Sequence, residues 1–579
     1  MFGVFEQPFN FWSEKILYQI HYPMKTFSPL ILIFIFSAFA VDAQLLSQQK
    51  IFTRADTLRG SITKERVWWD VLHYDLHVQF HDSDSTLQGF NKIHYKVLKT
   101  YQVMQIDLMR PLGIDSIIQD RLKINFRRDG NTYYVQLNSV QQENALRDIA
   151  IYYHGKPQIA ARPPWDGGVI WAQDKKGRPW ISVACQGLGA SVWYPCKDHQ
   201  YDEPDSAAIH ITVPNPLVAV ANGRLRSKTA GPLGDVTFYW AVVNPINNYN
   251  LIPYIGYYVN FSEVYHGEKG NLDVNYWVLD YNLGQAHTHL APDVHRMLKD
   301  FEYWFGPYPF YEDGYKIVDA PHLGMEHQSD IAYGNGYQNG YLNHDLSGSG
   351  WGLKWDFIVV HESAHEWFGN NITTRELADM WVHEGFANYS ETLFTTSEYG
   401  KEAGNDYVVG TRKRIRNDIP IIGRYGVNEE GSTDMYDKGG NMLHMIRQII
   451  NDDEKFRQIL RGLNKDFYHK TVTTAEIEND ISTRSGISFS HVFDQYLRTI
   501  KIPVLGYYVK EQQGIPYLYF RWTNCVPGFD MPVKIVVSPG EAMWLRPVEK
   551  VKRVRLKIAT LPEKIVDRNF YVEEKKESN

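Results

Sequence analysis

The hydrophobic pattern of this chain changes its period part-way along, and this change constrains the fold more than any other feature. Between residues 72 and 80 one strand face is apolar, formed by Leu72, Tyr74, Leu76, Val78 and Phe80. The opposite face is polar, formed by His73, Asp75, His77 and Gln79. The same alternation recurs in later segments, so residues 44–265 are predicted to form an extended β domain, with a hairpin turn at Asp129-Gly130.

The spacing of apolar residues becomes helical beyond about residue 285. It recurs in MLKDFEYWFG, LKWDFIVVHESAHEWFG, MLHMIRQII and EKFRQILRGL. Thr473 with Glu476 is a capping-box pattern at the start of a further helix. Pro503 marks the end of the helical region, and short strands follow it. We therefore expect a mostly helical domain at residues 266–502 and a small β domain at residues 503–579.

The N-terminal residues predict export. From Met24 the chain has one lysine, an apolar run at residues 29–41 and then small residues, with Val41 and Ala43 at the −3 and −1 positions of a cleavage site. The run is too short for a comfortable membrane span, and an uncleaved anchor is the alternative. Residues 1–43 are thus interpreted as an upstream extension plus a secretory signal. We expect a mature chain with no stable membrane span, in the periplasm or outside the cell.

Composition and charge limit the classes of protein to which this chain can belong. Hydrophobic residues make up 44% of the chain and charged residues 22%, as in soluble globular proteins. The formal net charge is −7, so no nucleic-acid partner is expected. Three cysteines do not make a disulfide framework, and whether Cys185 and Cys196 pair stays open. The oligomeric state stays open as well.

The segment His361-Glu362-Ser363-Ala364-His365 lies in an apolar context that predicts a helix. Residues four apart lie one turn apart on the same helix face, so His361 and His365 can reach one metal ion. Glu362 stands beside the first ligand, where it can hold and deprotonate a water at the metal. The pattern therefore indicates a catalytic metal site, although this short motif also occurs by chance.

Glu384 completes a set of three ligands. The 18 residues between His365 and Glu384 suffice to end one helix, cross a loop and return on a second helix. Two histidines and one glutamate leave a fourth tetrahedral position open, which is the catalytic rather than the structural zinc arrangement. We therefore predict one Zn²⁺ per chain. A helix whose His and Glu residues simply face solvent is the alternative, and it does not account for the apolar flanks.

With these residues the chain resembles the zinc aminopeptidase family of aminopeptidase N and the leukotriene hydrolases, which are gluzincin metallopeptidases. Two further segments carry the resemblance. Residues 323–327, LGMEH, resemble the family's Gly-x-Met-Glu-Asn exopeptidase motif, and residues 436–439, YDKG, resemble its Tyr-x-Lys-Gly segment. Weaker similarity runs from about residue 70 to 505 and includes the segment that contains Gln186.

The resemblance implies a role for each matched residue. Glu326 would bind the free α-ammonium group of a peptide, and Gln186 would help to line that pocket. Tyr436 would donate its hydroxyl to the oxyanion that forms during attack. The main chain at Gly324 and Met325 would hold the peptide as an added strand. The expected substrates are therefore peptides with a free N-terminus, cleaved with Glu362 as the base.

The resemblance also implies the fold class, an α+β multidomain protein. It would have an N-terminal β saddle-like domain, a thermolysin-like, mostly helical catalytic domain and a small C-terminal β-sandwich. The large C-terminal helical domain of many members is expected to be absent. His327 and His383 each replace an asparagine of the family pattern, and we interpret His383 as a supporting or packing residue rather than a fourth ligand. Glu391 either orients a ligating histidine or faces solvent.

Two other functions remain compatible with parts of this pattern. A metallo-endopeptidase of the same clan needs the metal site but not Glu326. A catalytically silent peptide-binding protein would have no need of a base at Glu362. We therefore predict a zinc-dependent aminopeptidase and keep these two as alternatives.

Overall fold

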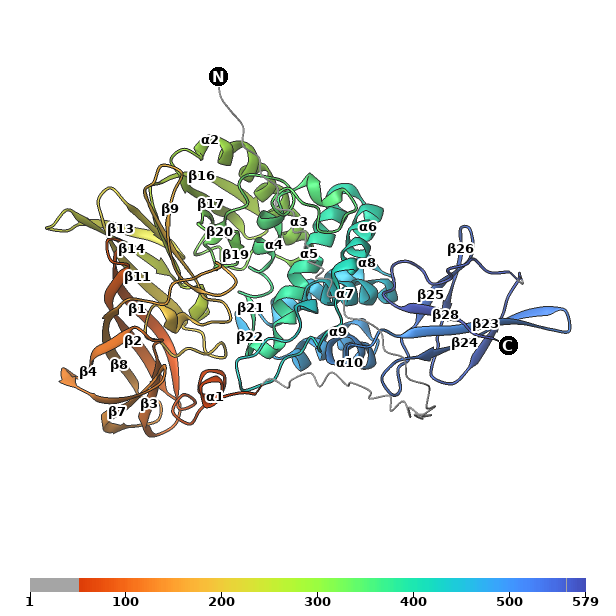
Figure 1. Cartoon of the computed structure of the whole chain (residues 1–579), viewed down its shortest axis with the longest axis horizontal. Coiled ribbons are helices and arrows are strands. Elements are labelled where there is room, and N and C mark those ends of the chain that lie inside the picture. Colours follow the sequence, from red (N-terminus) through yellow and green to blue (C-terminus); the bar gives the residue numbers. More distant parts are fainter. Residues whose placement is uncertain (1–50, 559, 579) are drawn as a thin grey trace, which may run out of the picture. The chain divides into compact units, whose positions relative to one another are not determined.

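Strands dominate the N-terminal part of the protein, as the two-residue alternation predicts (Figure 1). The computed structural model describes residues 51–558 and 560–578, so the predicted export signal lies outside the described residues. After helix α1 (Arg54–Gly60) come β1 (Trp69–His81), β2 (Thr86–Val97), β3 (Tyr101–Asp107), β4 (Gly113–Gln119), β5 (Leu122–Lys123), β6 (Asn125–Asp129), β7 (Thr132–Gln141), β8 (Leu146–Gly155), β9 (Gly168–Gln173), β10 (Pro179–Ala184), β11 (Ser206–Pro214), β12 (Val218–Ala221), β13 (Arg224–Ala230), β14 (Asp235–Val242) and β15 (Pro253–Gly256).

Most of these strands form one eight-stranded sheet, in the order β13-β14-β11-β1-β2-β8-β4-β5. β1 lies near its middle, parallel to β11 and antiparallel to β2. A four-stranded sheet, β12-β15-β10-β9, and a three-stranded sheet, β3-β7-β6, complete the region. The apolar side chains of these strands share one large buried cluster.

The predicted apolar face of β1 is confirmed at four of its five positions, since Tyr74, Leu76, Val78 and Phe80 are buried. Leu72 is only half-buried, because the register with β2 shifts between Val71 and His73 and Val71 takes the buried place. A register shift of one residue moves a side chain to the other face of a strand. The predicted hairpin also forms, but Asp129 pairs with Thr132, so the turn residues are Gly130-Asn131.

The region after β15 begins with a mixed five-stranded sheet, in the order β16-β17-β18-β20-β19. Its strands are β16 (Tyr258–Gly267), β17 (Gly270–Leu279), β18 (Tyr315–Asp319), β19 (Gly324–Met325) and β20 (Ile331–Tyr333), and the pair β21 (Ile372–Thr374) and β22 (Lys470–Val472) lies further on. The helices are α2 (Leu283–Gln285), α3 (Ala291–Phe305), α4 (Phe357–Ala364), α5 (Trp381–Tyr399), α6 (Lys401–Thr411), α7 (Asp437–Ile450), α8 (Asp453–Asp466), α9 (Thr474–Ser485) and α10 (Ser490–Arg498).

The helical segments predicted from apolar spacing are present, with one difference at α4. The pattern predicts a helix through His365 and beyond, but α4 ends at Ala364 and its last turn leads into a loop. Asp356 begins this helix by accepting hydrogen bonds from the amides of Ile358 and Val359, as an N-cap residue does. The capping box at Thr473 and Glu476 forms as predicted at the start of α9.

Strands return after α10, namely β23 (Val504–Gln512), β24 (Ile515–Thr523), β25 (Val533–Ser538), β26 (Glu541–Leu545), β27 (Lys552–Arg555) and β28 (Glu573–Lys576). They form a four-stranded sheet, β27-β24-β23-β28, and a pair, β25-β26. The guanidinium of Arg412 joins them to the helical region, since it donates to the carbonyls of Arg568 and Asn569 at 2.6 and 3.1 Å. The protein is thus a mixed α+β protein with a β-rich N-terminal region and a helical region after it, and the domain ranges remain predictions.

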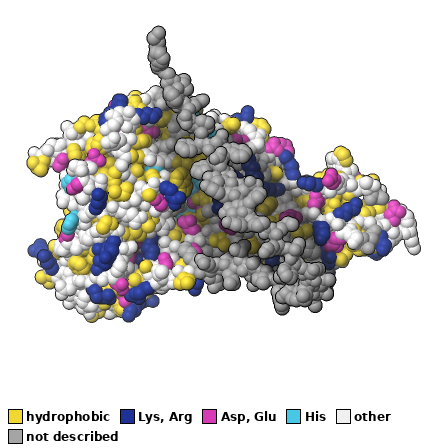
Figure 2. Space-filling model, in the orientation of Figure 1, with side chains coloured by type: hydrophobic (Ala, Val, Ile, Leu, Met, Phe, Trp, Pro, Cys, Tyr) yellow, Lys and Arg dark blue, Asp and Glu magenta, His cyan; other side chains and the backbone are white. Residues whose placement is uncertain are grey.

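The described surface mixes charges of both signs. Figure 2 shows Lys and Arg side chains interspersed with Asp and Glu side chains over the β-rich part of the visible face. Among the described residues, no helix is both long enough and apolar enough to cross a membrane. All three cysteines carry free thiols, and those of Cys185 and Cys196 are buried.

Candidate active site with a metal-ligand triad

Helix α4 presents His361 and Glu362 from its last turn, and His365 follows as its C-terminal cap. His365 keeps helical backbone angles, φ −64° and ψ −20°, although the helix has ended. The two imidazoles therefore remain one turn apart on one face, as the spacing predicts. All three side chains are buried, with Glu362 9% exposed.

Glu384 approaches the two histidines from the first turn of α5. Its Oε2 lies 3.7 Å from His361 Nε2 and 3.5 Å from His365 Nε2. One ligand atom from each of the three side chains lies within 4.8 Å of the others. Glu384 Oε2 is buried and accepts no hydrogen bond from the described residues. A buried carboxylate oxygen without such a partner, facing two imidazole nitrogens, fits a metal ligand.

Each histidine is oriented through its other ring nitrogen. His361 Nδ1 lies 2.7 Å from Glu391 Oε1, and the hydroxyl of Tyr407 donates to Glu391 Oε2 at 2.7 Å. His365 Nδ1 lies 3.1 Å from the carbonyl oxygen of Phe368. Such contacts place the proton on Nδ1 and leave Nε2 free to bind a cation. Glu391 is buried, so of its two interpretations the orienting one agrees with the geometry.

The two histidines that depart from the family pattern lie outside the triad. His383 Nε2 accepts a hydrogen bond from the amide of Thr374 at 2.9 Å, and burial lowers the pKa of His383 to about 3. This agrees with a supporting or packing role. His327 contacts the hydroxyl of Tyr254 through Nδ1, and burial holds the pKa of His327 well below its usual range. At position 327 a neutral imidazole thus replaces the asparagine side chain of the family pattern.

Glu326 faces the metal-ligand triad from the loop after β19. One oxygen each of Glu326 and Glu362 and one nitrogen of His365 lie within 4.8 Å of one another. Glu326 Oε1 accepts hydrogen bonds from Gln186 Nε2 and, at 3.0 Å, from the hydroxyl of Tyr249. Gln186 Nε2 also lies 3.5 Å from Glu384 Oε1. The structure therefore brings Gln186 and Glu326 together beside the triad.

Strand β19, which consists of Gly324 and Met325, is the edge strand of the mixed sheet and pairs only with β20 among the described strands. A Cβ atom at position 324 would lie 2.6 Å from Glu362 Oε1 and 2.9 Å from two carbons of Ile358. Only a residue without a side chain fits so close to α4. The strand edge is thus placed directly beside the carboxylate of Glu362.

Tyr436 lies at the start of α7, half-buried, with its ring 6.1 Å from that of His361 at an interplanar angle of 26°. Burial raises the pKa of Tyr436 well above its usual range, and the carboxylate of Glu384 adds to this effect. The phenol therefore keeps its proton at neutral pH and can act as a hydrogen-bond donor. All nine residues predicted from the sequence lie around this one site.

The carboxyl groups of the site have unequal pKa values because their surroundings differ. Burial raises the pKa of Glu362 to about 7, although His361 and His365 oppose the rise. Burial also raises the pKa of Glu326, against the opposing charge of His365. For Glu384 the imidazoles of His365 and His361 outweigh the effect of burial and lower the pKa. Glu384 is thus suited to bind a cation, and Glu362 to exchange a proton near neutral pH.

Sequence reasoning missed two residues of the site, Tyr249 and Tyr407. Tyr249 lies in the short 3-10 helix Asn248–Asn250 after β14, and Tyr407 lies on α6, so neither belongs to a motif. Each donates its hydroxyl to a glutamate of the site, Tyr249 to Glu326 and Tyr407 to Glu391. No periodicity or spacing could have revealed these contacts, since both depend on how the chain packs.

The fold and the donor set together define a zinc-metallopeptidase architecture, with two imidazoles and one carboxylate on two facing helices. Comparison with known proteins shows what the chain is similar to. Residues 302–496 match the model of the Peptidase family M1 domain. The expected resemblance to zinc aminopeptidases is confirmed.

Curated relatives include aminopeptidase M1-D of Oryza sativa subsp. japonica, 23% identical over 56% of this chain and 38% of the relative. Aminopeptidase N of Canis lupus familiaris is 26% identical over 50% of this chain and 31% of the relative. Human aminopeptidase B is 22% identical over 67% of this chain and 56% of the relative. The chain thus spans between about a third and just over half of the length of these relatives.

Among solved structures, an M1 zinc metallopeptidase from Deinococcus radiodurans, with a Tyr-Ser-Ala substrate bound, has a similar fold. The TM-score is 0.64 at 21% identity, and the match covers 75% of this chain and 95% of that protein. The donor set of this chain fits the zinc ion of such proteins, because His361, His365 and Glu384 are buried, converge and leave one carboxylate oxygen without a hydrogen-bond donor.

Proposed function

We propose that this protein is a zinc-dependent aminopeptidase that hydrolyses the first peptide bond of peptides with a free N-terminus. One observation carries the proposal. The buried carboxylate of Glu326 lies within 4.8 Å of both Glu362 and His365. A peptide ammonium group bound to Glu326 would therefore lie within about one residue of the bond that Glu362 can help to cleave.

The metal would be held by His361, His365 and Glu384. When bound, a zinc ion polarises a carbonyl and lowers the pKa of a water molecule. Glu362 accepts a proton from the attacking water at its carboxylate and then returns this proton to the leaving amine. Its pKa of about 7 suits both transfers near neutral pH. Tyr436 keeps its phenolic proton and donates a hydrogen bond to the developing oxyanion.

Preference for a free N-terminus follows from the burial of Glu326, which is 2% exposed. A buried carboxylate is costly unless a cation or hydrogen-bond donors satisfy it. Gln186 and Tyr249 donate only to its Oε1, so a terminal ammonium group can still pair with the carboxylate. An internal peptide bond would offer no positive charge there. The edge of β19 supplies main-chain groups for the next residues of the peptide.

The remaining expectations are part of the same proposal. The fold would be that of an N-terminal saddle-like β domain, a thermolysin-like catalytic domain and a small C-terminal β-sandwich. The pattern at residues 24–43 supports export to the periplasm or the cell exterior. Peptides are the proposed partners, because the chain is similar to proteins named aminopeptidases.

The test is hydrolysis of a panel of aminoacyl fluorogenic amides, each with and without an N-acetyl cap, before and after removal of metal by a chelator. We expect cleavage that needs both the free amine and the metal. Glu362→Gln should abolish turnover and keep one zinc ion in the triad, because the change removes the base and no metal ligand. Glu326→Gln should lower kcat/KM for free amines towards the background level of the capped substrates, because the change removes the charge that pairs with the ammonium group.

Each alternative has its own outcome. Equal cleavage of capped and free substrates would identify an endopeptidase and remove the role of Glu326. Zinc binding without cleavage of any substrate would favour a peptide-binding protein. Full activity in Glu362→Gln would remove the proposed base.

A further inference from the structure

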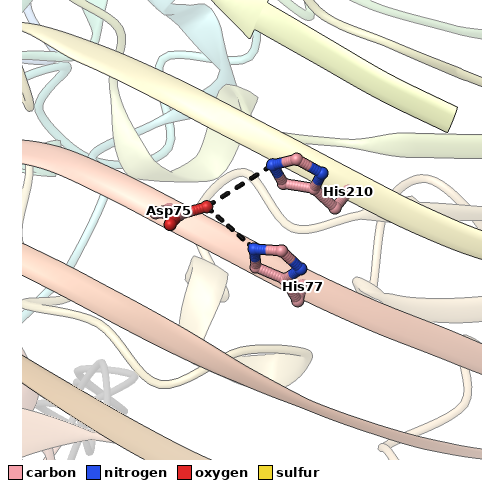
Figure 3. Close-up of side chains that lie close together, drawn as sticks. All are labelled: Asp75, His77 and His210. Carbon is pink, nitrogen blue, oxygen red and sulfur yellow. Dashed lines mark hydrogen bonds and ion pairs between the residues drawn. The ribbon is translucent and has the colours of Figure 1, made fainter. Parts of the chain in front are cut away.

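The polar face of β1 contains a second group of metal-ligating side chains, far along the chain from the catalytic motif. Asp75 and His77 of β1 lie beside His210 of the neighbouring strand β11 (Figure 3). Asp75 Oδ1 lies 3.0 Å from His77 Nε2 and 3.5 Å from His210 Nε2. One ligand atom from each residue lies within 4.8 Å of the other two.

The backbone of the sheet fixes this arrangement. Asp75 and His77 are two residues apart on one strand and therefore point to the same face. β1 and β11 run parallel, and His77 is paired in register with His210. Neighbouring strands lie roughly 4.8 Å apart, a spacing at which two facing imidazoles can reach one ion. No loop has to close to bring the three groups together.

Both imidazoles belong to a row of stacked rings. The ring of His77 lies between Phe90 and His210, at centroid distances of 4.3 and 4.0 Å, and His210 stacks on Tyr239 at 4.3 Å. The four residues come from β2, β1, β11 and β14, which are adjacent strands of the eight-stranded sheet. An imidazole binds a metal ion in the plane of its ring, so both rings must tilt out of the parallel stack for their Nε2 atoms to bind one ion, and this tilt weakens binding at the site.

The cluster is open to solvent, and burial and hydrogen bonding shift the pKa values of His210 and Asp75. The side chains of His77, Asp75 and His210 are 36%, 30% and 22% exposed, so an ion can reach them and complete its coordination with water. Burial and the neighbouring His77 lower the pKa of His210 to about 4, so this imidazole is neutral at pH 7. The hydrogen bond from His77 lowers the pKa of Asp75, which keeps the carboxylate ionised.

We propose that Asp75, His77 and His210 form a second metal site, which binds a divalent transition-metal ion such as Zn²⁺ apart from the catalytic triad. Two imidazoles and one carboxylate suit this class of ion rather than Mg²⁺ or Ca²⁺, which prefer oxygen ligands. Both histidines coordinate through Nε2. The ion then takes the place of the proton that His77 Nε2 shares with Asp75, and this proton moves to Nδ1 of the same ring. The bound ion links β1 to β11 across the centre of the sheet.

The site is tested by counting metal. The full-length protein is stripped with a chelator and dialysed against buffered free Zn²⁺, and zinc per chain is measured by mass spectrometry. We expect two zinc ions per wild-type chain, with the second one bound more weakly because its ligands are exposed. His210→Phe should bind one ion, because phenylalanine keeps the stack between His77 and Tyr239 but supplies no ligand. Asp75→Asn should weaken the second site at least tenfold.

His73→Phe is the matched control, since His73 lies on the same face of β1 and outside the cluster. It should still bind two ions. Zinc content is measured without any assay of activity, so this test is independent of the proposed function. A chain with His361→Ala and His365→Ala should lose only the ion of the catalytic triad. One zinc ion per wild-type chain at saturating free Zn²⁺, or two ions in both His210→Phe and Asp75→Asn, would overturn the proposal. Two ions in wild type and in His73→Phe, with one in His210→Phe, would support it.

Discussion

In the candidate active site, each side chain proposed to bind metal or substrate is oriented by a hydrogen bond to an outer residue. Glu391 fixes the ring of His361, the carbonyl of Phe368 fixes that of His365, and Gln186 and Tyr249 hold Glu326. A hydrogen bond to the second nitrogen selects the tautomer of an imidazole and raises its basicity. The outer residues should therefore control metal affinity and catalysis without touching the substrate.

Glu391→Gln tests one such pair. The amide keeps the shape of the carboxylate but loses its charge, so we expect zinc affinity at the catalytic site to fall about tenfold to a hundredfold. Competition with a chromophoric chelator measures this affinity. Glu398→Gln on the same helix is the control, because Glu398 pairs with Arg296 and not with a ligand. Unchanged affinity in Glu391→Gln would contradict the role given to this carboxylate.

Tyr436→Phe removes one hydroxyl from the site. If this hydroxyl stabilises the oxyanion, kcat should fall by about a hundredfold to a thousandfold, with little change in KM, since the interaction forms mainly in the transition state. Steady-state kinetics on an uncapped aminoacyl amide provides both values. Zinc content should stay the same, because Tyr436 is not among the metal-ligand residues. A rise in KM at constant kcat would indicate a substrate-binding role instead.

Among helices and strands, the decisive contact is that of β19 with α4. The strand passes so close to the helix that position 324 has no room for a side chain, and this closeness brings the free strand edge beside Glu362. The Asp356 cap fixes the first turn of α4, and the ligands come from its other end. In the proposed function, two elements would thus position the substrate main chain and the catalytic base.

Gly324→Ala should therefore reduce activity although it adds only a methyl group. The new Cβ would lie 2.6 Å from Glu362 Oε1, so the carboxylate or the strand must shift. We expect kcat/KM to fall at least tenfold at unchanged zinc content. Gly113→Ala is the control, because a Cβ there meets no atom within 4 Å. Equal activity in the wild type and Gly324→Ala would show that the space can adjust freely.

Helix α3 contains a carboxyl group that links stability to pH. Asp300 is 6% exposed, its Oδ2 has no hydrogen-bond partner among the described residues, and burial raises its pKa to about 7. From about pH 4 to about pH 7 the folded protein keeps a proton that the unfolded chain loses, so this group lowers stability as pH rises.

Asp300→Asn should remove this effect. We expect the variant to be more stable than wild type by about 1 to 3 kcal/mol at pH 8, and the gap to close towards pH 4. Urea unfolding across this pH range measures it. Asp494→Asn, at a side chain 49% exposed, should change stability little at any pH. A gap that does not vary with pH would mean that Asp300 is ionised throughout.

Across the whole chain, the proposed catalytic metal would connect parts that are distant in sequence. Its ligands come from α4 and α5, and the residues around them come from the β-rich region and from α7. An ion that binds only the folded protein stabilises it in proportion to the logarithm of its concentration. Catalytic competence and global stability should thus depend on the same ion.

Removal of zinc should lower Tm. At a zinc concentration about a thousandfold above Kd, binding contributes roughly 4 kcal/mol, and the stripped protein loses this contribution. Differential scanning calorimetry of stripped, zinc-reloaded and magnesium-treated protein gives the comparison, and only zinc should restore Tm. Measuring His210→Phe alongside separates the catalytic ion from the proposed second one. Equal Tm with and without zinc would mean that the triad binds no ion under these conditions.

The sequence by itself determined the features that depend on local spacing. Alternation with period two predicted the β-rich region, apolar spacing predicted the helices, and the intervals among His361, His365 and Glu384 predicted a convergent triad. These features follow from the geometry of one strand, or of two short helices joined by a loop. They therefore need no knowledge of how distant segments pack.

Only the tertiary structure decided the contacts between segments far apart in the chain. Tyr249 beside Glu326, the close approach of Gly324 to Glu362, and His210 opposite His77 each join residues that no motif connects. The register shift that buries Val71 instead of Leu72 depends likewise on pairing with β2. Such contacts depend on strand register and on packing between elements, and these emerge only when the whole chain buries its apolar faces together.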